Sequence, residues 1–127
     1  MHRRHLLATA PALLVTACAA PASAPPAIAV FFTADSASLE GEASEVVRRA
    51  AVAARGSTAP ITVLGFAGPA GGAAYNRALS EARAQHVADM LIENGVARER
   101  VRIVPRGPVP FEAMATESRR VEIRIGG

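Results

Sequence analysis

The stretch that decides the fold is Leu64–Val87, LGFAGPAGGAAYNRALSEARAQHV. It opens as the end of an apolar strand and runs into a loop with four glycines and a proline between positions 65 and 72. Glycines allow sharp turns and the close approach of another backbone. Polar and apolar residues then follow at helical spacing up to Asn94-Gly95, which is typical of a helix end. The stretch predicts a strand, a glycine-rich turn and a long helix over about 73–93.

Together with the flanking sequence, this stretch predicts four strands and two helices. Apolar residues at helical spacing indicate an amphipathic helix over about 41–54. Short runs rich in β-branched and aromatic residues predict strands at 28–32, 61–64, 101–104 and 121–125. Three prolines and a glycine indicate a loop over 105–118.

The order β-α-β-α-β-β favours an α+β fold. The runs at 101–104 and 121–125 alternate apolar and charged residues, so each strand is expected to have one solvent-exposed face. We therefore expect a two-layer sandwich, with two helices packed on one face of a mixed four-stranded sheet. In the second helix, the expected buried stripe consists of Tyr75, Leu79, Ala82, Val87, Met90 and Leu91.

Composition excludes several classes of function. The formal charge of the 127 residues is +3, but Arg3 and Arg4 lie in a basic N-terminal segment, and without them 12 arginines face 11 acids. A nearly neutral domain lacks the basic patch of a nucleic-acid-binding protein. His86 has no Ser or Cys partner in view, and the counts rule out a Cys/His metal cluster. We expect no catalytic residues, no metal and no cofactor.

The N-terminus indicates export and lipidation. Residues 1–17 combine a basic start with an apolar stretch of about a dozen residues, too short to span a bilayer of roughly 30 Å. Val15-Thr16-Ala17-Cys18 resembles a bacterial lipobox, in which the cysteine thiol receives a diacylglycerol. Residues 18–27 are then the lipidated cysteine and a Pro/Ala tether, and 28–127 the domain. The arginine pair at the start fits either a Sec or a twin-arginine signal.

Two motifs carry a resemblance to a known family. The run Tyr75–Val87 reads Tyr-Asn-x-x-Leu-Ser-x-x-Arg-Ala-x-x-Val, and Arg119–Ile123 reads Arg-Arg-Val-Glu-Ile. Both motifs resemble the OmpA C-terminal-like domain, a family known for binding peptidoglycan. The resemblance covers about Val30 to Ile125.

The resemblance implies a ligand site in which one of the family's residues is missing. The family holds the diaminopimelate of the peptidoglycan stem peptide between an Asp after the second strand and an Arg on the following helix. Here the helix residues correspond to Arg83 and Asn76, but the Asp position is Gly68 and no acid lies between Leu64 and Ser80. Arg119 and Arg120, before the last strand, are further candidates for ligand contact or for an ordinary solvated pair.

The predicted function follows the same resemblance. We expect a lipoprotein anchored at Cys18 on the periplasmic side of the outer membrane, or of the inner membrane, that binds peptidoglycan. The alternative keeps the fold without that ligand and acts as a structural or protein-interaction module of the envelope. Peptidoglycan binding predicts a pocket in which Arg83 lies open beside the loop of Gly68. A cavity closed by Phe66, or Arg83 paired with an acid or a chain end, would favour the alternative.

Replacing Cys18 tests the anchor. Cys18→Ser removes the only thiol, and the short tether offers no other apolar anchor, so the variant should leave the membrane fraction. Fractionation of cells after a high-salt wash measures this. A variant that still sediments with membranes would contradict lipidation at Cys18.

Overall fold

The computed structural model describes residues 11–12, 26–111 and 113–126. Cys18 and nearly all of the predicted signal and tether lie outside these ranges. The elements, in chain order, are β1 (Ile28–Phe31), α1 (Gly41–Arg55), β2 (Ile61–Ala67), α2 (Ala73–Glu93), the 3₁₀ helix η1 (Arg98–Arg100), β3 (Val101–Pro108), the 3₁₀ helix η2 (Ala115–Ser118) and β4 (Arg120–Ile125). Within the described ranges, no helix is long and apolar enough to cross a membrane.

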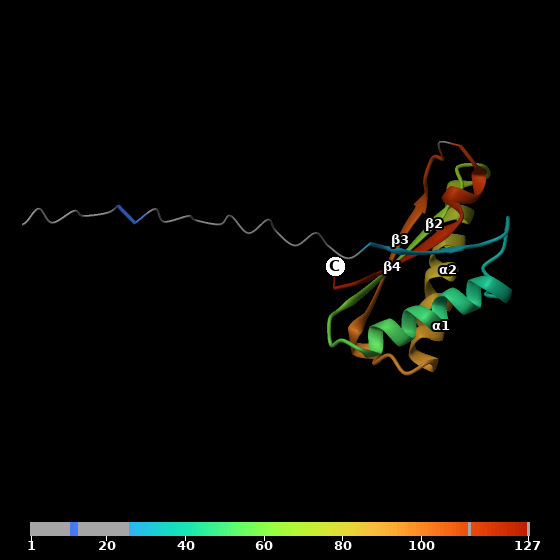
Figure 1. Cartoon of the computed structure of the whole chain (residues 1–127). Helices are drawn as coiled ribbons and strands as arrows, with labels where there is room; N and C mark the ends of the chain where they lie inside the picture. The colour runs from blue at the N-terminus through green and yellow to red at the C-terminus, as the bar shows by residue number, and fades with distance from the viewer. Residues whose placement is uncertain (1–10, 13–25, 112, 127) are drawn as a thin grey trace, which may run out of the picture.

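The strands form one mixed sheet in the order β1-β4-β2-β3. Strand β4 runs antiparallel to both β1 and β2, whereas β2 and β3 are parallel. Both helices lie on the same side of the sheet, with α1 crossing α2 (Figure 1). The predicted α+β sandwich is confirmed, including the bounds of α2.

The core lies between the helices and the facing side chains of the strands. Alternate residues of the two central strands, such as Val63 and Ile123, are fully buried against Val47, Val87 and Leu91 of the helices. Gly65 sets how closely α2 approaches β2, because a Cβ there would lie only 2.0 Å from the backbone oxygen of Ser80. Any side chain at position 65 would push the helix off the sheet.

The predicted buried stripe of α2 was right at Val87 and Leu91 but wrong in phase over the first half of the helix. The buried residues are Asn76, Ser80, Arg83, Ala84, Val87, Ala88 and Leu91. Tyr75 is 52% exposed, whereas Leu79, Ala82 and Met90 are only partly buried. Three polar residues therefore occupy the inward face near the start of α2, where the prediction placed apolar ones.

The predicted loop at 105–118 was also wrong in part, because β3 continues through Pro108. Proline lacks an N–H and is tolerated in an edge strand, whose outer side has no ladder partner. Strand β3 is such an edge, so Pro105 and Pro108 leave its pairing with β2 intact across one irregularity at Gly65/Phe66. Strand β2 is correspondingly longer than predicted and ends at Ala67.

The corrected phase predicts unequal costs for two leucine truncations in α2. Leu91→Ala removes a fully buried side chain and should reduce the free energy of unfolding by about 2–5 kcal/mol. Leu79→Ala, at a partly buried position, should cost clearly less. Denaturant unfolding of both variants measures the difference, and an equal or reversed order would mean that the helix packs in the predicted phase.

Candidate functional site

Arg83 is the largest of the fully buried side chains among the described residues, with no exposed surface. Its guanidinium donates to three backbone carbonyl oxygens: Nε to Ser36 at 2.8 Å, Nη1 to Phe66 at 3.2 Å and Nη2 to Thr33 at 3.1 Å. Two of these carbonyls belong to the β1–α1 loop and the third to β2. Arg83 therefore fastens α2 to both the loop and the sheet. The expectation that Arg83 would lie open beside Gly68 was wrong, because these carbonyls take up its donors inside the protein.

The positively charged guanidinium of Arg83 is bonded to no acid among the described residues. The guanidinium carbon lies 5.3 Å from the centre of the Phe32 ring, within range of a cation–π interaction. Burial lowers the pKa of Arg83, and the positive charge of Arg119 lowers it further. Neither of the pairings considered from the sequence, with a neighbouring acid or a chain end, is found among the described residues.

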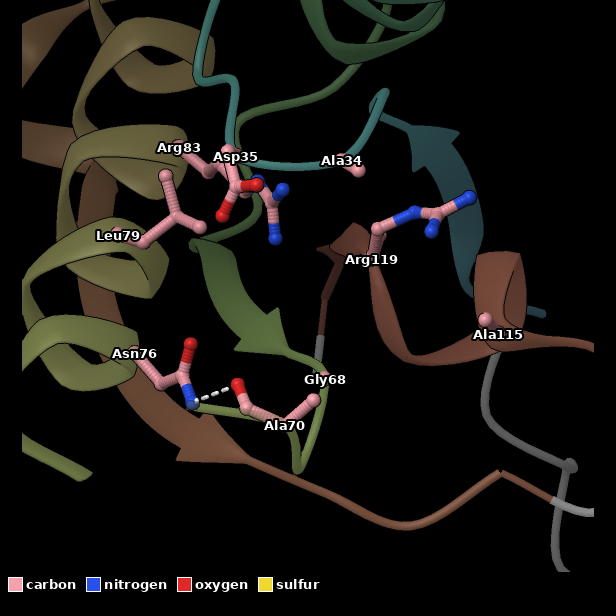
Figure 2. Close-up of a pocket in the computed structure, with 9 residues that line it drawn as sticks. All are labelled: Ala34, Asp35, Gly68, Ala70, Asn76, Leu79, Arg83, Ala115 and Arg119. Carbon is pink, nitrogen blue, oxygen red and sulfur yellow. Dashed lines mark hydrogen bonds between the residues drawn. The ribbon is translucent and has the colours of Figure 1, made fainter. Parts of the chain in front are cut away.

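A cavity of about 170 Å³ lies beside Arg83, at the end of the sheet where the β1–α1 and β2–α2 loops meet η2. Figure 2 shows its nine lining residues: Ala34, Asp35, Gly68, Ala70, Asn76, Leu79, Arg83, Ala115 and Arg119. Gly68, Asn76, Arg83 and Arg119 were all predicted site residues, and the fold brings them together around this one cavity. Phe66 is not part of the lining.

Asp35 is the lining residue that the sequence analysis missed. It lies in the β1–α1 loop with a left-handed backbone, at φ 53°, which Asp tolerates better than most residues. The hydroxyl of Tyr75 donates to its carboxylate over 3.2 Å, and this hydrogen bond raises the pKa of Tyr75. In the sequence, Asp35 is simply the first residue of a polar turn, with no signal that links it to α2.

Asn76 and Gly68 shape the opposite wall. The Asn76 side-chain amide donates to the Ala70 carbonyl over 2.8 Å, which fixes the glycine-rich loop (Figure 2). Gly68 contributes bare backbone, and a Cβ there would lie 3.2 Å from the Ser118 hydroxyl. The loop is thus held in shape by a buried side chain, and position 68 has little spare room towards η2.

The two arginines before β4 have different surroundings. Arg119 lines the cavity and donates to the Thr116 hydroxyl over 3.0 Å, while its Nε is buried without a partner among the described residues. Arg120 does not line the cavity. It stacks on the Phe66 ring at 4.2 Å and bonds Glu122 and the Glu117 carbonyl. Of these two arginines only Arg119 lines the cavity, and Figure 2 shows its guanidinium pointing away from Asp35 and Arg83.

Known proteins share this architecture. The model of the OmpA family matches residues 31–124, most of the chain and all elements around the cavity. This chain belongs to the OmpA family. Outer membrane protein 40 of Porphyromonas gingivalis is 40% identical over 79 residues, 61% of this chain but only 21% of that protein.

Solved structures show the same OmpA-like fold. The peptidoglycan-associated lipoprotein of Burkholderia pseudomallei superposes with a TM-score of 0.69 at 24% identity, over 76% of this chain and 87% of that one. The C-terminal domain of Helicobacter pylori MotB gives a TM-score of 0.66 at 21% identity, over 78% and 82%. OmpA-like domains of this kind are non-enzymatic modules, which confirms the prediction that the chain is not an enzyme.

The cavity of this OmpA-family domain combines both signs of charge. Asp35 supplies a carboxylate from one loop, and Arg119 supplies a guanidinium from the segment before β4, with the buried charge of Arg83 behind. Among the described residues Asp35 takes part in no ion pair, so its charge is available to an incoming cation. A small ligand with an ammonium and a carboxylate group matches this arrangement.

Arg83 is predicted to be needed for folding as well as for the site. Arg83→Lys keeps the charge, but one ammonium group cannot reproduce the planar fork that reaches three separate carbonyls. Buried carbonyls left without a donor should lower the free energy of unfolding by about 1–3 kcal/mol each. Denaturant unfolding measures this, with exposed Arg77→Lys on the same helix as the control. Equal stability of Arg83→Lys and wild type would contradict a structural role.

Proposed function

We propose that this OmpA-family domain binds peptidoglycan through the cavity beside Arg83. The ammonium group of a stem-peptide diaminopimelate pairs with Asp35, and its carboxylate is held in the positive field of Arg83 by Arg119, whose side chain turns towards the cavity on binding. The observation that carries this proposal is Asp35, because it supplies the acid that Gly68 lacks. The name of one structural neighbour, the peptidoglycan-associated lipoprotein of Burkholderia pseudomallei, supports the ligand class.

The same proposal includes the envelope location. A lipid on Cys18 and about nine residues of Pro/Ala tether, at roughly 3.1 Å each, would keep the domain within about 28 Å of its membrane. The periplasmic side of the outer membrane is the proposed site, and the outer membrane relative supports it. The chain spans about a fifth of that relative, so the likeness concerns only the OmpA-like part.

Asp35→Asn tests the ligand clamp. The change keeps size and hydrogen bonding but removes the charge, and we expect at least a tenfold loss of affinity for diaminopimelate-type sacculi, or about 1.4 kcal/mol. Asp89→Asn is the matched control, since Asp89 lies on α2 outside the cavity. Co-sedimentation with purified sacculi, and competition by free diaminopimelate, measure the effect.

Two outcomes would count against the proposal. If wild type does not sediment with sacculi, the domain serves the envelope without this ligand, as a structural or protein-interaction module. If wild type binds and Asp35→Asn binds equally well, the ammonium group is not held by Asp35. The second conclusion requires a correctly folded Asp35→Asn protein, which its unfolding midpoint checks.

A further inference from the structure

The outer edge of β1 has main-chain groups that face away from the sheet. The Phe32 N–H donates to the Arg119 carbonyl over 2.9 Å, so Phe32 points towards the β4 side. Residues two apart point the same way in an antiparallel ladder, which places Val30 and Ile28 on that side as well. The N–H and C=O groups of Ala29 and Phe31 therefore point outward, at the end of the sheet order.

The two edges of the sheet differ in their protection against further pairing. Strand β3, at one edge, contains Pro105 and Pro108 and the exposed Arg102 and Arg106, and prolines and charges of this kind block strand addition. Strand β1, at the other edge, reads Ile-Ala-Val-Phe, with neither a proline nor a charge. Among the described residues, the β1 edge therefore lacks the proline and charge protection that the β3 edge has.

Side chains beside this edge add an apolar surface. Phe31 is 49% exposed and Phe111 42% exposed, and both line a groove of about 430 Å³ with Ala29, Pro110, Glu117 and Arg120. The charge of Arg120 is already engaged, because its guanidinium bonds Glu122 and stacks on Phe66. The groove therefore favours an apolar side chain rather than a charged one.

We propose that a second copy of this chain pairs with the β1 edge, antiparallel and around a two-fold axis at Val30. In this register Ala29 of each copy lies opposite Phe31 of the other copy. The outward N–H and C=O groups of the two residues then form two reciprocal N–H···O=C hydrogen bonds. The small Ala29 side chain then lies beside the large Phe31 ring on the same face, and the edge is complementary to itself. Two four-stranded sheets become one continuous sheet.

The dimer leaves the ligand cavities free. None of Ala29, Val30 and Phe31 lines the cavity of Asp35 and Arg119. Two open cavities on one dimer would allow bivalent attachment to a polymer with repeated stem peptides, which raises the apparent affinity without new contacts. The pairing itself follows from the strand edge and does not depend on the identity of that ligand.

Sedimentation equilibrium tests the pairing. Because the sheet and both helices lie within residues 28–125, the measurement uses residues 18–127 with Cys18→Ser. Wild type should form dimers at millimolar concentration or below. Ala29→Pro removes an outward N–H, and Phe31→Lys places a charge at the interface, so each should lower the dimer association constant at least tenfold. Val52→Lys is the control, since Val52 is 60% exposed on α1.

Disulfide trapping in the full-length chain tests the register. Val30 faces its own copy as a non-hydrogen-bonded pair, with Cα atoms about 4.5 Å apart, a distance that a disulfide can bridge. Val30→Cys treated with a thiol oxidant in cells should give a cross-linked dimer, and Val52→Cys should give little. A wild-type chain that stays monomeric, a dimer unchanged by both β1 variants, or equal cross-linking at the two positions would overturn the proposal.

Discussion

The fold around the cavity depends on the burial of the Arg83 guanidinium. A cation removed from water is costly unless hydrogen bonds replace its hydration, and here three carbonyl oxygens do so. The loop is stabilised as well, because its carbonyls, which have no partner in the sheet, accept hydrogen bonds from a charged donor. The loop, the end of β2 and the start of α2 are thereby held at one place, and the cavity is the space between them.

This arrangement requires α2 to lie very close to the sheet. Gly65 permits that approach by presenting no side chain to the Ser80 backbone, and the Ser80 hydroxyl accepts a hydrogen bond from the Gly107 N–H over 3.2 Å. Asn76 completes the set by holding Ala70 in the glycine-rich loop. The motif residues Asn76, Ser80 and Arg83 are all buried, so much of the motif that identifies the family maintains its architecture.

The sequence predicts the elements of this domain well because most of them follow hydrophobic periodicity. The same rule fails on α2, since it counts Asn76 and Arg83 as outward residues although backbone carbonyls satisfy them inside the protein. It fails again at β3, where prolines signal a loop but an edge strand accepts them. Asp35 could not be predicted as a site residue because only the fold brings it beside Tyr75, 40 residues further along the chain.

The position of the acid also affects which ligands the cavity can prefer. Gly68 lies on the β2–α2 loop, with Ser118 close to its Cα, whereas Asp35 lies on the β1–α1 loop beside α2. A ligand whose ammonium group meets Asp35 is therefore oriented differently from one that would meet an acid at position 68. The lining also has one carboxylate against two guanidinium groups, Arg83 and Arg119. Burial lowers the pKa of Arg83, and the nearby charge of Arg119 lowers it further. Under the proposed function, a ligand with more carboxylates than ammonium groups offsets this excess of positive charge, so the more acidic ends of a stem peptide would be favoured.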